Sequence, residues 1–369
     1  MKGGSAVFVA VLVFLADQFS SAISLGKPRV PAIYIFGDSI SDDGNNNGLN
    51  IDPRQAKANY PPYGVDLEAG PTGRFTNGKN FVDFIAEKLG LPLAPAYLSL
   101  GKEKRQKIAT GLNYASGSAG ILPETGSALG ERVPLDKQID HFQTTVEEDL
   151  LPQFSSKAAV QDHLGRSTIF IDIGGNDLLN NWIQQKPEYN RSKNYPRVPD
   201  YVHLLMETLQ AQIKRIYDLG GRRFLVFGLA PIGCIPIVTH EGAPCEETWN
   251  SMAREFNNQL APLTQRLQSR LHGSVFALGL TYDLILDFHR NPSRYGFKSV
   301  NQPCCVVNST APTLCVPGTA PCANRKEYLY YDMFHCTSKT AKIVAHSCFH
   351  RGPGSVCPPT AIKKLVSKH

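Results

Sequence analysis

Two separate blocks of the sequence carry residues that together could cleave or transfer an acyl group. In the first, a short apolar stretch beginning at Ile33 leads into a turn rich in Gly, Asp and Asn, and delivers Ser39 there. This pattern predicts a buried strand followed by a tight turn, and in parallel α/β sheets chemistry collects at the carboxyl ends of strands. Ser39 is therefore a candidate nucleophile, with an ordinary turn serine as the alternative interpretation.

The second block supplies a candidate base. Asp332 lies three residues before His335, and a neutral imidazole oriented by a carboxylate can accept the proton that a hydroxyl loses when it attacks an ester. Asp200 and His203 repeat the spacing. There, a preceding proline and apolar residues at helical period predict that Asp200 is a helix N-cap and that His203 lies in the first turn.

Two blocks between them offer hydrogen-bond donors for a developing oxyanion. Residues 111–120 are mostly small, so backbone amides there can approach a ligand closely. The β-branched run Thr168–Ile173 predicts a strand that places Asn176 just beyond its carboxyl end. A close-packed turn and an Asx turn are the structural alternatives for these two blocks.

In this order, the four blocks resemble those of the GDSL esterase/lipase family, also called SGNH hydrolases, and in particular its plant branch. The resemblance covers nearly the whole chain after the first residues, and rests on these segments: Phe36–Ile40 with Asp42–Asn47, Asn113–Gly117, Gly174–Asp177, Asp332–His335, Pro71–Gly78 and Gly228–Pro236. It implies a serine hydrolase that acts on carboxylic esters through an acyl-enzyme.

The resemblance also implies a role for particular residues. Ser39 corresponds to the nucleophile, His335 to the general base and acid, and Asp332 to the carboxylate that orients His335. The oxyanion hole would be formed by the amides of Ser39 and Gly117 and by the side chain of Asn176. Each such donor contributes about 3 kcal/mol of transition-state stabilisation.

The sequence departs from the family pattern at two positions. Ile40 stands where leucine is usual, and Cys336 follows His335 where proline is common. A disulfide at Cys336 would shift or rigidify the histidine loop. The sequence has no G-x-S-x-G nucleophile elbow, which argues against an ordinary α/β-hydrolase.

The surrounding pattern predicts the fold that must position these residues. Strand-like runs at residues 33–36, 168–173, 223–227 and 275–278 alternate with helix-like stretches at residues 80–89, 202–219 and 248–271. Such alternation predicts a parallel sheet with helices on both faces. We expect residues 23–369 to form one hydrolase domain, a three-layer α/β/α sandwich with a mainly parallel sheet of the flavodoxin-like SGNH type.

The N-terminal residues have the pattern of a signal peptide. Lys2 precedes an apolar run from Ala6 to Ala16, and small residues at Ser20–Ala22 provide a cleavage site. We therefore expect residues 1–22 to be removed and the mature protein to be secreted, to the apoplast or cell wall. The apolar run is shorter than the ~20 residues that span a bilayer, so we expect no transmembrane segment.

Cysteine usage agrees with an oxidising compartment. All nine cysteines lie beyond residue 233, and disulfides are the expectation. We pair Cys234 with Cys245 across a short loop as a hypothesis. Zinc is the competing interpretation for the cysteines between Cys304 and Cys322. The odd count leaves at least one thiol free or intermolecular.

Two sequons predict glycosylation at Asn190 and Asn308.

Charge and motif together narrow the function. The chain has 38 Lys and Arg against 32 Asp and Glu, with no basic and aromatic interleaving, so nucleic acid is not an expected partner. The small positive excess allows weak binding to an acidic wall polysaccharide. Ester hydrolysis is the leading hypothesis, on a small-molecule, lipid or polysaccharide ester, by a monomer without cofactor or metal. An acyltransferase using the same acyl-enzyme and a non-catalytic secreted binding protein are the alternatives.

Overall fold

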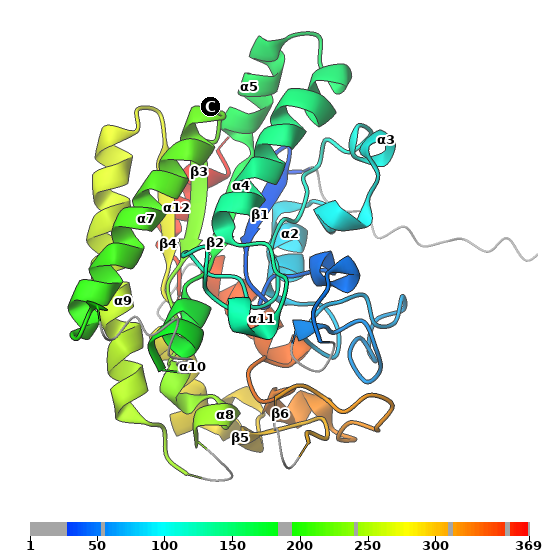
Figure 1. The fold of residues 1–369 in the computed structure, drawn as a ribbon, viewed down its shortest axis with the longest axis vertical. Helices are drawn as coiled ribbons and strands as arrows, with labels where there is room; N and C mark the ends of the chain where they lie inside the picture. Colours follow the sequence, from blue (N-terminus) through cyan, green and yellow to red (C-terminus); the bar gives the residue numbers. More distant parts are fainter. Residues whose placement is uncertain are drawn as a thin grey trace, which may run out of the picture.

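A parallel sheet of four strands forms the centre of the protein (Figure 1). The computed structural model describes residues 28–52, 56–183, 194–239, 243–308, 313–350 and 355–367, and the expected signal peptide lies outside them. The strands pair in chain order: β1 (Ile33–Gly37), β2 (Thr168–Asp172), β3 (Arg223–Phe227) and β4 (Val275–Gly279). Each matches a predicted strand to within one residue at either end, because each is a short run of apolar, β-branched or aromatic residues.

A further extended segment runs beside β1 on the edge away from β2. The backbone of residues 110–116 is parallel to β1 and exchanges hydrogen bonds with it, including Ile35 N to Leu112 O at 3.0 Å and Tyr114 N to Ile35 O at 2.8 Å. Gly111 permits this approach, since its φ is 111° and a Cβ there would lie 1.8 Å from the Ile33 carbonyl oxygen. The segment that follows β1 thus lies on one side of it and β2 lies on the other, so the strand order changes direction at β1. Open α/β sheets bind ligands at such a point.

Helices cover both faces of the sheet. One face packs a large apolar core against α4 (Leu135–Thr144), α5 (Lys157–Arg166), α7 (Val198–Asp218) and α9 (Glu247–Arg270). The opposite face packs a second core against α2 (Phe81–Leu89), α10 (Tyr282–Arg290), α11 (Ser338–Cys348) and α12 (Pro359–Leu365). The predicted α/β fold with a mainly parallel sheet is confirmed, and the three layers are visible in Figure 1.

One helix begins earlier than the sequence predicts. Helix α7 starts at Val198 with Arg197 as its N-cap, so the prediction that Asp200 caps this helix is wrong. Asp200 instead lies inside the first turn, where its carboxylate pairs with the Arg197 guanidinium at 2.7 Å. The Arg197 side chain makes no capping hydrogen bond to the helix backbone, and Pro199 lies in the first turn, where its missing N–H costs no hydrogen bond.

A disulfide-bonded lobe lies below the carboxyl ends of the central strands. Strands β5 (Ser299–Pro303) and β6 (Tyr328–Tyr330) pair there as a second, two-stranded sheet. The short helix α8 (Pro236–Thr239) packs against β5, whereas the short helix α3 (Lys102–Arg105) lies elsewhere. Disulfides join Cys304 to Cys322 and Cys305 to Cys315 within this lobe. No helix in the described ranges is both long and apolar enough to span a bilayer.

Candidate active site

Ser39 lies just beyond the carboxyl end of β1, in a turn held by its own neighbours. The Asp38 carboxylate accepts the Ile40 amide at 3.0 Å, and the Asp38 carbonyl accepts the Ser41 amide at 3.1 Å. This turn presents the Ser39 hydroxyl to His335, whose Nε2 lies 2.7 Å from Ser39 Oγ. The distance suits direct proton transfer between a nucleophile and its base.

The loop after β6 brings Asp332 and His335 together. Asp332 Oδ1 accepts the backbone amides of Phe334 and His335, each at 2.8 Å, so the carboxylate organises the loop that carries the histidine. His335 Nδ1 lies 2.8 Å from Asp332 Oδ2 and 2.9 Å from Oδ1. With Nδ1 donating to the carboxylate, Nε2 is left free to accept the serine proton. The Phe75 ring packs against His335, with ring centroids 4.9 Å apart.

Tyr63 is a site residue that the sequence analysis missed. Its hydroxyl donates to Asp332 Oδ2 at 2.6 Å and accepts the Cys315 amide at 3.2 Å, and both Tyr63 and Asp332 are fully buried. Burial, followed by the charge of Asp332, raises the pKa of Tyr63 well above its usual value, so the phenol stays a donor. Tyr63 lies outside the motif blocks and 269 residues from Asp332, so no local pattern in the sequence indicates their contact.

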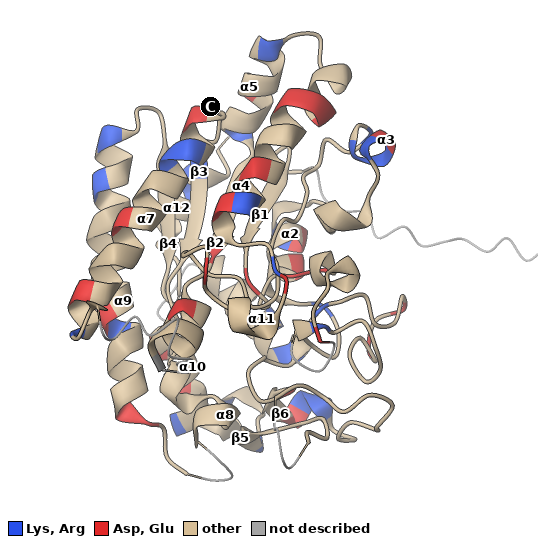
Figure 2. Cartoon of the chain, in the orientation of Figure 1, with Lys and Arg blue, Asp and Glu red and all other residues tan. Residues whose placement is uncertain are grey.

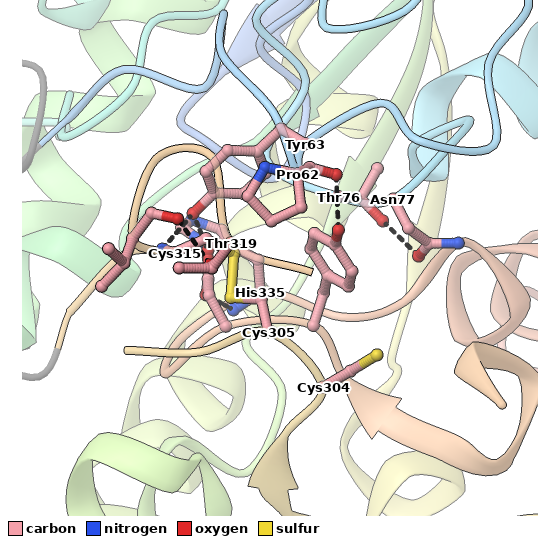
Figure 3. The surroundings of a disulfide bond; sticks show 12 residues. Pro62, Tyr63, Thr76, Asn77, Cys304, Cys305, Cys315, Thr319 and His335 are labelled. Carbon is pink, nitrogen blue, oxygen red and sulfur yellow. Dashed lines mark hydrogen bonds and ion pairs between the residues drawn. A yellow bond between two sulfur atoms is a disulfide. The ribbon is translucent and has the colours of Figure 1, made fainter. Parts of the chain in front are cut away.

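The Cys305–Cys315 disulfide supports this arrangement from the neighbouring lobe. Figure 3 shows the disulfide close to Pro62, Tyr63 and His335. The Tyr60 hydroxyl also donates to the Cys315 carbonyl at 3.0 Å. The half-cystine backbone is therefore bonded to both tyrosines, which ties the disulfide lobe to the catalytic carboxylate.

The two other expected oxyanion donors, Asn176 and Gly117, differ in what they contact. Asn176 lines the cavity in front of Ser39, and its Nδ2 donates to the Ala119 carbonyl at 3.0 Å, which leaves a second amide hydrogen for a ligand. The Gly117 amide donates to Asp42 Oδ2 at 3.0 Å. The amide of Ser118, the next residue, has no acceptor among the described residues, and Ser118 lines the cavity.

Two buried aspartates near the site have structural contacts. Asp42 also accepts the amides of Gly44 and Asn45, and Asp177 accepts those of Ile121 and Leu122. Desolvation raises the pKa of each carboxyl to about 6, although these hydrogen bonds oppose the rise. Both carboxyls fix the loops around the site, so their role is positioning.

A cavity of about 230 Å³ opens in front of the Ser39–His335 pair and continues into the protein. Its outer wall includes partly exposed residues such as Leu129, Asn180 and Phe334. Its inner wall is formed by buried apolar side chains of the core between the sheet and helices α2, α10 and α11. The arrangement suits an ester whose carbonyl sits at Ser39 and whose apolar part lies inside.

The remaining residues singled out from the sequence lie elsewhere or are otherwise occupied. Cys234 and Cys245 are joined in a disulfide. The cysteines considered for zinc form the two disulfides of the lobe. A fourth disulfide joins Cys348 to Cys357, so Cys336 is the free thiol, and the disulfide considered for Cys336 is absent. Burial raises the pKa of Cys336 to about 12.

The second aspartate and histidine pair does not line this cavity, and the two sequons fall partly or wholly outside the described residues. His203 is exposed on α7 with its Nε2 3.5 Å from Glu207. Asn308 is exposed, while the residues that complete its sequon lie outside the described ranges, as does Asn190.

Comparison with known proteins identifies relatives over most of the chain. The family model described as GDSL-like lipase/acylhydrolase matches residues 33–348. GDSL esterase/lipase 7 of Arabidopsis thaliana is 41% identical over 88% of this chain and 89% of its own. GDSL esterase/lipase At1g71691 of the same plant is 37% identical over 94% of this chain and 88% of its own.

A solved structure also matches at low similarity. The extracellular lipase of Streptomyces rimosus is 14% identical, with 86% of this chain and 99% of that chain covered and a TM-score of 0.34.

Proposed function

The chain belongs to the GDSL-like lipase/acylhydrolase family, whose members are ester-hydrolysing serine hydrolases, and we propose that it cleaves carboxylic esters through an acyl-enzyme on Ser39. The observation that carries the proposal is the continuous chain of contacts from Ser39 Oγ through His335 to the buried Asp332 carboxylate. This is the arrangement of a nucleophile, its base and the group that orients the base.

The proposed reaction has two steps. Ser39 Oγ attacks the ester carbonyl while its proton passes to His335 Nε2, which then protonates the departing alcohol as the ester C–O bond breaks. In the second step, a water molecule attacks the acyl-enzyme carbonyl and gives a proton to Nε2. Nε2 then returns this proton to Ser39 Oγ as the bond between Oγ and the acyl group breaks and the acid leaves. Asp332 stabilises the imidazolium that forms in each step and does not itself take up the proton.

The tetrahedral intermediate carries a negative oxygen that needs donors. The Ser39 amide has no acceptor among the described residues, and Asn176 presents an amide to the same cavity, so both are proposed donors. For Gly117 to serve as the third donor, its hydrogen bond to Asp42 must be released; the Ser118 amide is the alternative. Replacing the backbone amide of Gly117 or of Ser118 by an ester distinguishes these two residues. Turnover should fall strongly only when the amide that binds the oxyanion is replaced.

The experiment that tests the proposed function compares wild-type protein with Ser39→Ala and His335→Ala on p-nitrophenyl esters from acetate to palmitate. We expect wild-type turnover, together with labelling of Ser39 by a fluorophosphonate, and loss of at least a thousandfold of activity in each variant. Folded wild-type protein that neither turns over any ester nor reacts with the fluorophosphonate would leave only the binding-protein alternative. Added acceptor alcohols test the acyltransferase alternative, since transfer would give a new ester in place of free acid.

Secretion is part of the same proposal. The four disulfides fit an oxidising compartment. On the outer helices α4, α5, α7 and α9, basic and acidic residues are interspersed (Figure 2). We expect cleavage after Ala22 and glycosylation at Asn190 and Asn308. N-terminal sequencing of secreted protein and its change in mass on enzymatic deglycosylation check both.

A further inference from the structure

The inner part of the cavity continues from Ser39 into the core between the sheet and the helices behind it. Its inner wall comes from α2, α10 and α11, with Phe81, Ile285 and Val344 as the apolar lining. These side chains are buried, whereas the outer wall is partly open to solvent. The cavity therefore has an open mouth at the catalytic serine and a closed apolar end.

This shape decides which half of an ester each end can hold. In the proposed reaction, the alcohol leaves first and water replaces it, while the acyl group stays attached to Ser39. The alcohol therefore belongs at the open mouth, and the acyl chain at the closed end.

Two carboxyls, those of Asp38 and Asp172, line this otherwise largely apolar cavity. Asp172 is the last residue of β2, in register with Gly37 of β1 and Phe227 of β3, and it lines the cavity. Alternation along β2 directs Asp172 to the same face of the sheet as Phe170, which belongs to the core behind the sheet. Across the sheet, Asp172 of β2 is in register with Phe227 of β3, which is in register with Gly279 of β4. The Phe227 ring lies over Gly279, where a Cβ would be 2.2 Å from a ring carbon.

Asp172 has no partner of its own in this cavity. Among the described residues, none donates a hydrogen bond to either of its carboxyl oxygens. In contrast, the neighbouring Asp38 accepts the Ile40 amide, and Asp177 accepts two amides and the Thr125 hydroxyl. Asp172 is only partly buried, so a ligand that covers it is favoured if it completes the carboxyl's hydrogen bonds, because a desolvated polar group without a partner is costly.

We propose that the inner cavity binds the acyl chain of the substrate and that Asp172 contacts a hydroxyl group on that chain, so that hydroxyacyl esters are preferred over plain acyl esters. The proposal rests on the proposed ester hydrolysis. Desolvation raises the pKa of Asp172 to about 7, so below that pH the carboxyl is neutral and can both donate to and accept from a hydroxyl. A plain alkyl chain would instead displace water from the carboxyl and leave it unpaired.

The test compares p-nitrophenyl octanoate with its 2-, 3- and 8-hydroxy analogues on wild-type protein and on Asp172→Leu. The measured quantity is the ratio of kcat/KM for each hydroxyoctanoate to kcat/KM for octanoate. We expect the ratio to exceed one in wild-type protein for at least one analogue and to fall about tenfold in Asp172→Leu, which corresponds to the net value of about one hydrogen bond. Octanoate itself should become a better substrate of Asp172→Leu.

Two further variants keep the test decisive. Asp172→Asn retains a hydrogen-bonding group of the same size, should fold where Asp172→Leu does not, and should keep part of the preference. Val344→Ala enlarges the closed end and should move the optimum to a longer chain without changing the hydroxyl ratio. If wild-type protein hydrolyses octanoate but its ratio does not exceed one for any analogue, or does not change in either Asp172 variant, the inference is wrong although the proposed function stands. Absence of any ester turnover or fluorophosphonate labelling would instead overturn the proposed function.

Discussion

The Tyr63 hydroxyl donates to Asp332 Oδ2 at 2.6 Å, on the same oxygen that lies 2.8 Å from His335 Nδ1. Asp332 Oδ1 is occupied by the Phe334 and His335 amides. The buried carboxylate thus has donors on both oxygens without any Lys or Arg beside it in these contacts. Its negative charge is held by neutral donors, which orient the carboxylate without cancelling its attraction for the imidazolium.

Tyr63→Phe should lower both activity and stability. Loss of the hydroxyl leaves Asp332 Oδ2 with one donor fewer in a buried site, at a cost of about 1–3 kcal/mol. We expect kcat/KM to fall about tenfold and the melting temperature to fall. Tyr60→Phe is the matched control, because its hydroxyl bonds to the Cys315 carbonyl and not to Asp332. Equal losses in the two variants would mean that the Tyr63 contact has no particular effect on catalysis.

Asn176→Ala should slow the chemical step much more than it weakens substrate binding. Removing one oxyanion donor costs about 10²–10³ in kcat in enzymes of this mechanism. The control is Asn180→Ala, since Asn180 Nδ2 donates to Asn176 Oδ1 at 3.1 Å and only supports it. We expect a loss below tenfold there. A large rise in KM with unchanged kcat for Asn176→Ala would assign this residue to ground-state binding.

The four central strands and helices α2, α7 and α9 could be predicted because their signals are local. A short apolar run ended by Gly or Asp is enough to predict β1 and β2, and Asn80 both caps α2 and forms a reciprocal capping box with Asp83, as its side-chain type favours. Helix α7 instead begins at Val198 without a side-chain cap, so no residue type marks its start in the sequence. Helix ends are less well determined by periodicity than helix interiors.

The site could be predicted only where its residues sit in recognisable blocks. Ser39 and Asn176 follow the neighbouring strands β1 and β2, so the central sheet brings them to one edge. His335 follows β6 of the two-stranded sheet, and the packing of that lobe brings it to Ser39. Tyr63 reaches Asp332 across a separation of 269 residues, and no local pattern reports such a contact. The hydrogen bond between Gly117 and Asp42 is likewise set by how two turns pack, which the sequence does not reveal.

The protein should have one thiol, and that thiol should be slow to react. Eight of its nine cysteines form disulfides, and Cys336 is left. Desolvation raises the pKa of Cys336 to about 12, so little thiolate is present at pH 8. We expect Ellman's reagent to detect no rapid thiol in native protein and one per chain after denaturation. Rapid reaction of one thiol in native protein, abolished by Cys336→Ala, would contradict this expectation.

The Cys305–Cys315 disulfide should matter for activity as well as stability. Closing its short loop contributes about 2–4 kcal/mol, and the Cys315 amide donates to Tyr63. The double variant Cys305→Ala, Cys315→Ala should therefore lose both stability and kcat/KM. The Cys348→Ala, Cys357→Ala variant removes a disulfide of similar loop length, with a sequence separation of 9 against 10, at the end of α11. It should lose stability with a smaller loss of activity, and equal activity losses would show that the Tyr63 connection is unimportant.

Asp172 should make the protein less stable as the pH rises. Its usual carboxyl pKa is about 4, and desolvation raises the folded value to about 7. Between these values, the unfolded chain binds fewer protons than the folded protein, so this carboxyl lowers the free energy of unfolding with increasing pH. The titratable groups lining the same cavity are Asp38, Tyr330, His335 and Cys336, and repulsion from Asp172 adds to the desolvation that raises the pKa of Asp38 to about 8.

Asp172→Asn removes that dependence and supplies the measurement. The melting temperature of Asp172→Asn minus that of wild-type protein should become more positive from pH 4 to pH 8. Asp287→Asn is a control of opposite sign, because hydrogen bonds from Tyr295 and Asn291 lower the pKa of Asp287. A lowered pKa gives stability that is present above the unfolded value and is lost on acidification, so the deficit of Asp287→Asn should shrink as the pH falls toward 3. A difference for Asp172→Asn that stays constant from pH 4 to pH 8 would show that Asp172 titrates alike in the folded and unfolded states, and that the cavity does not desolvate it.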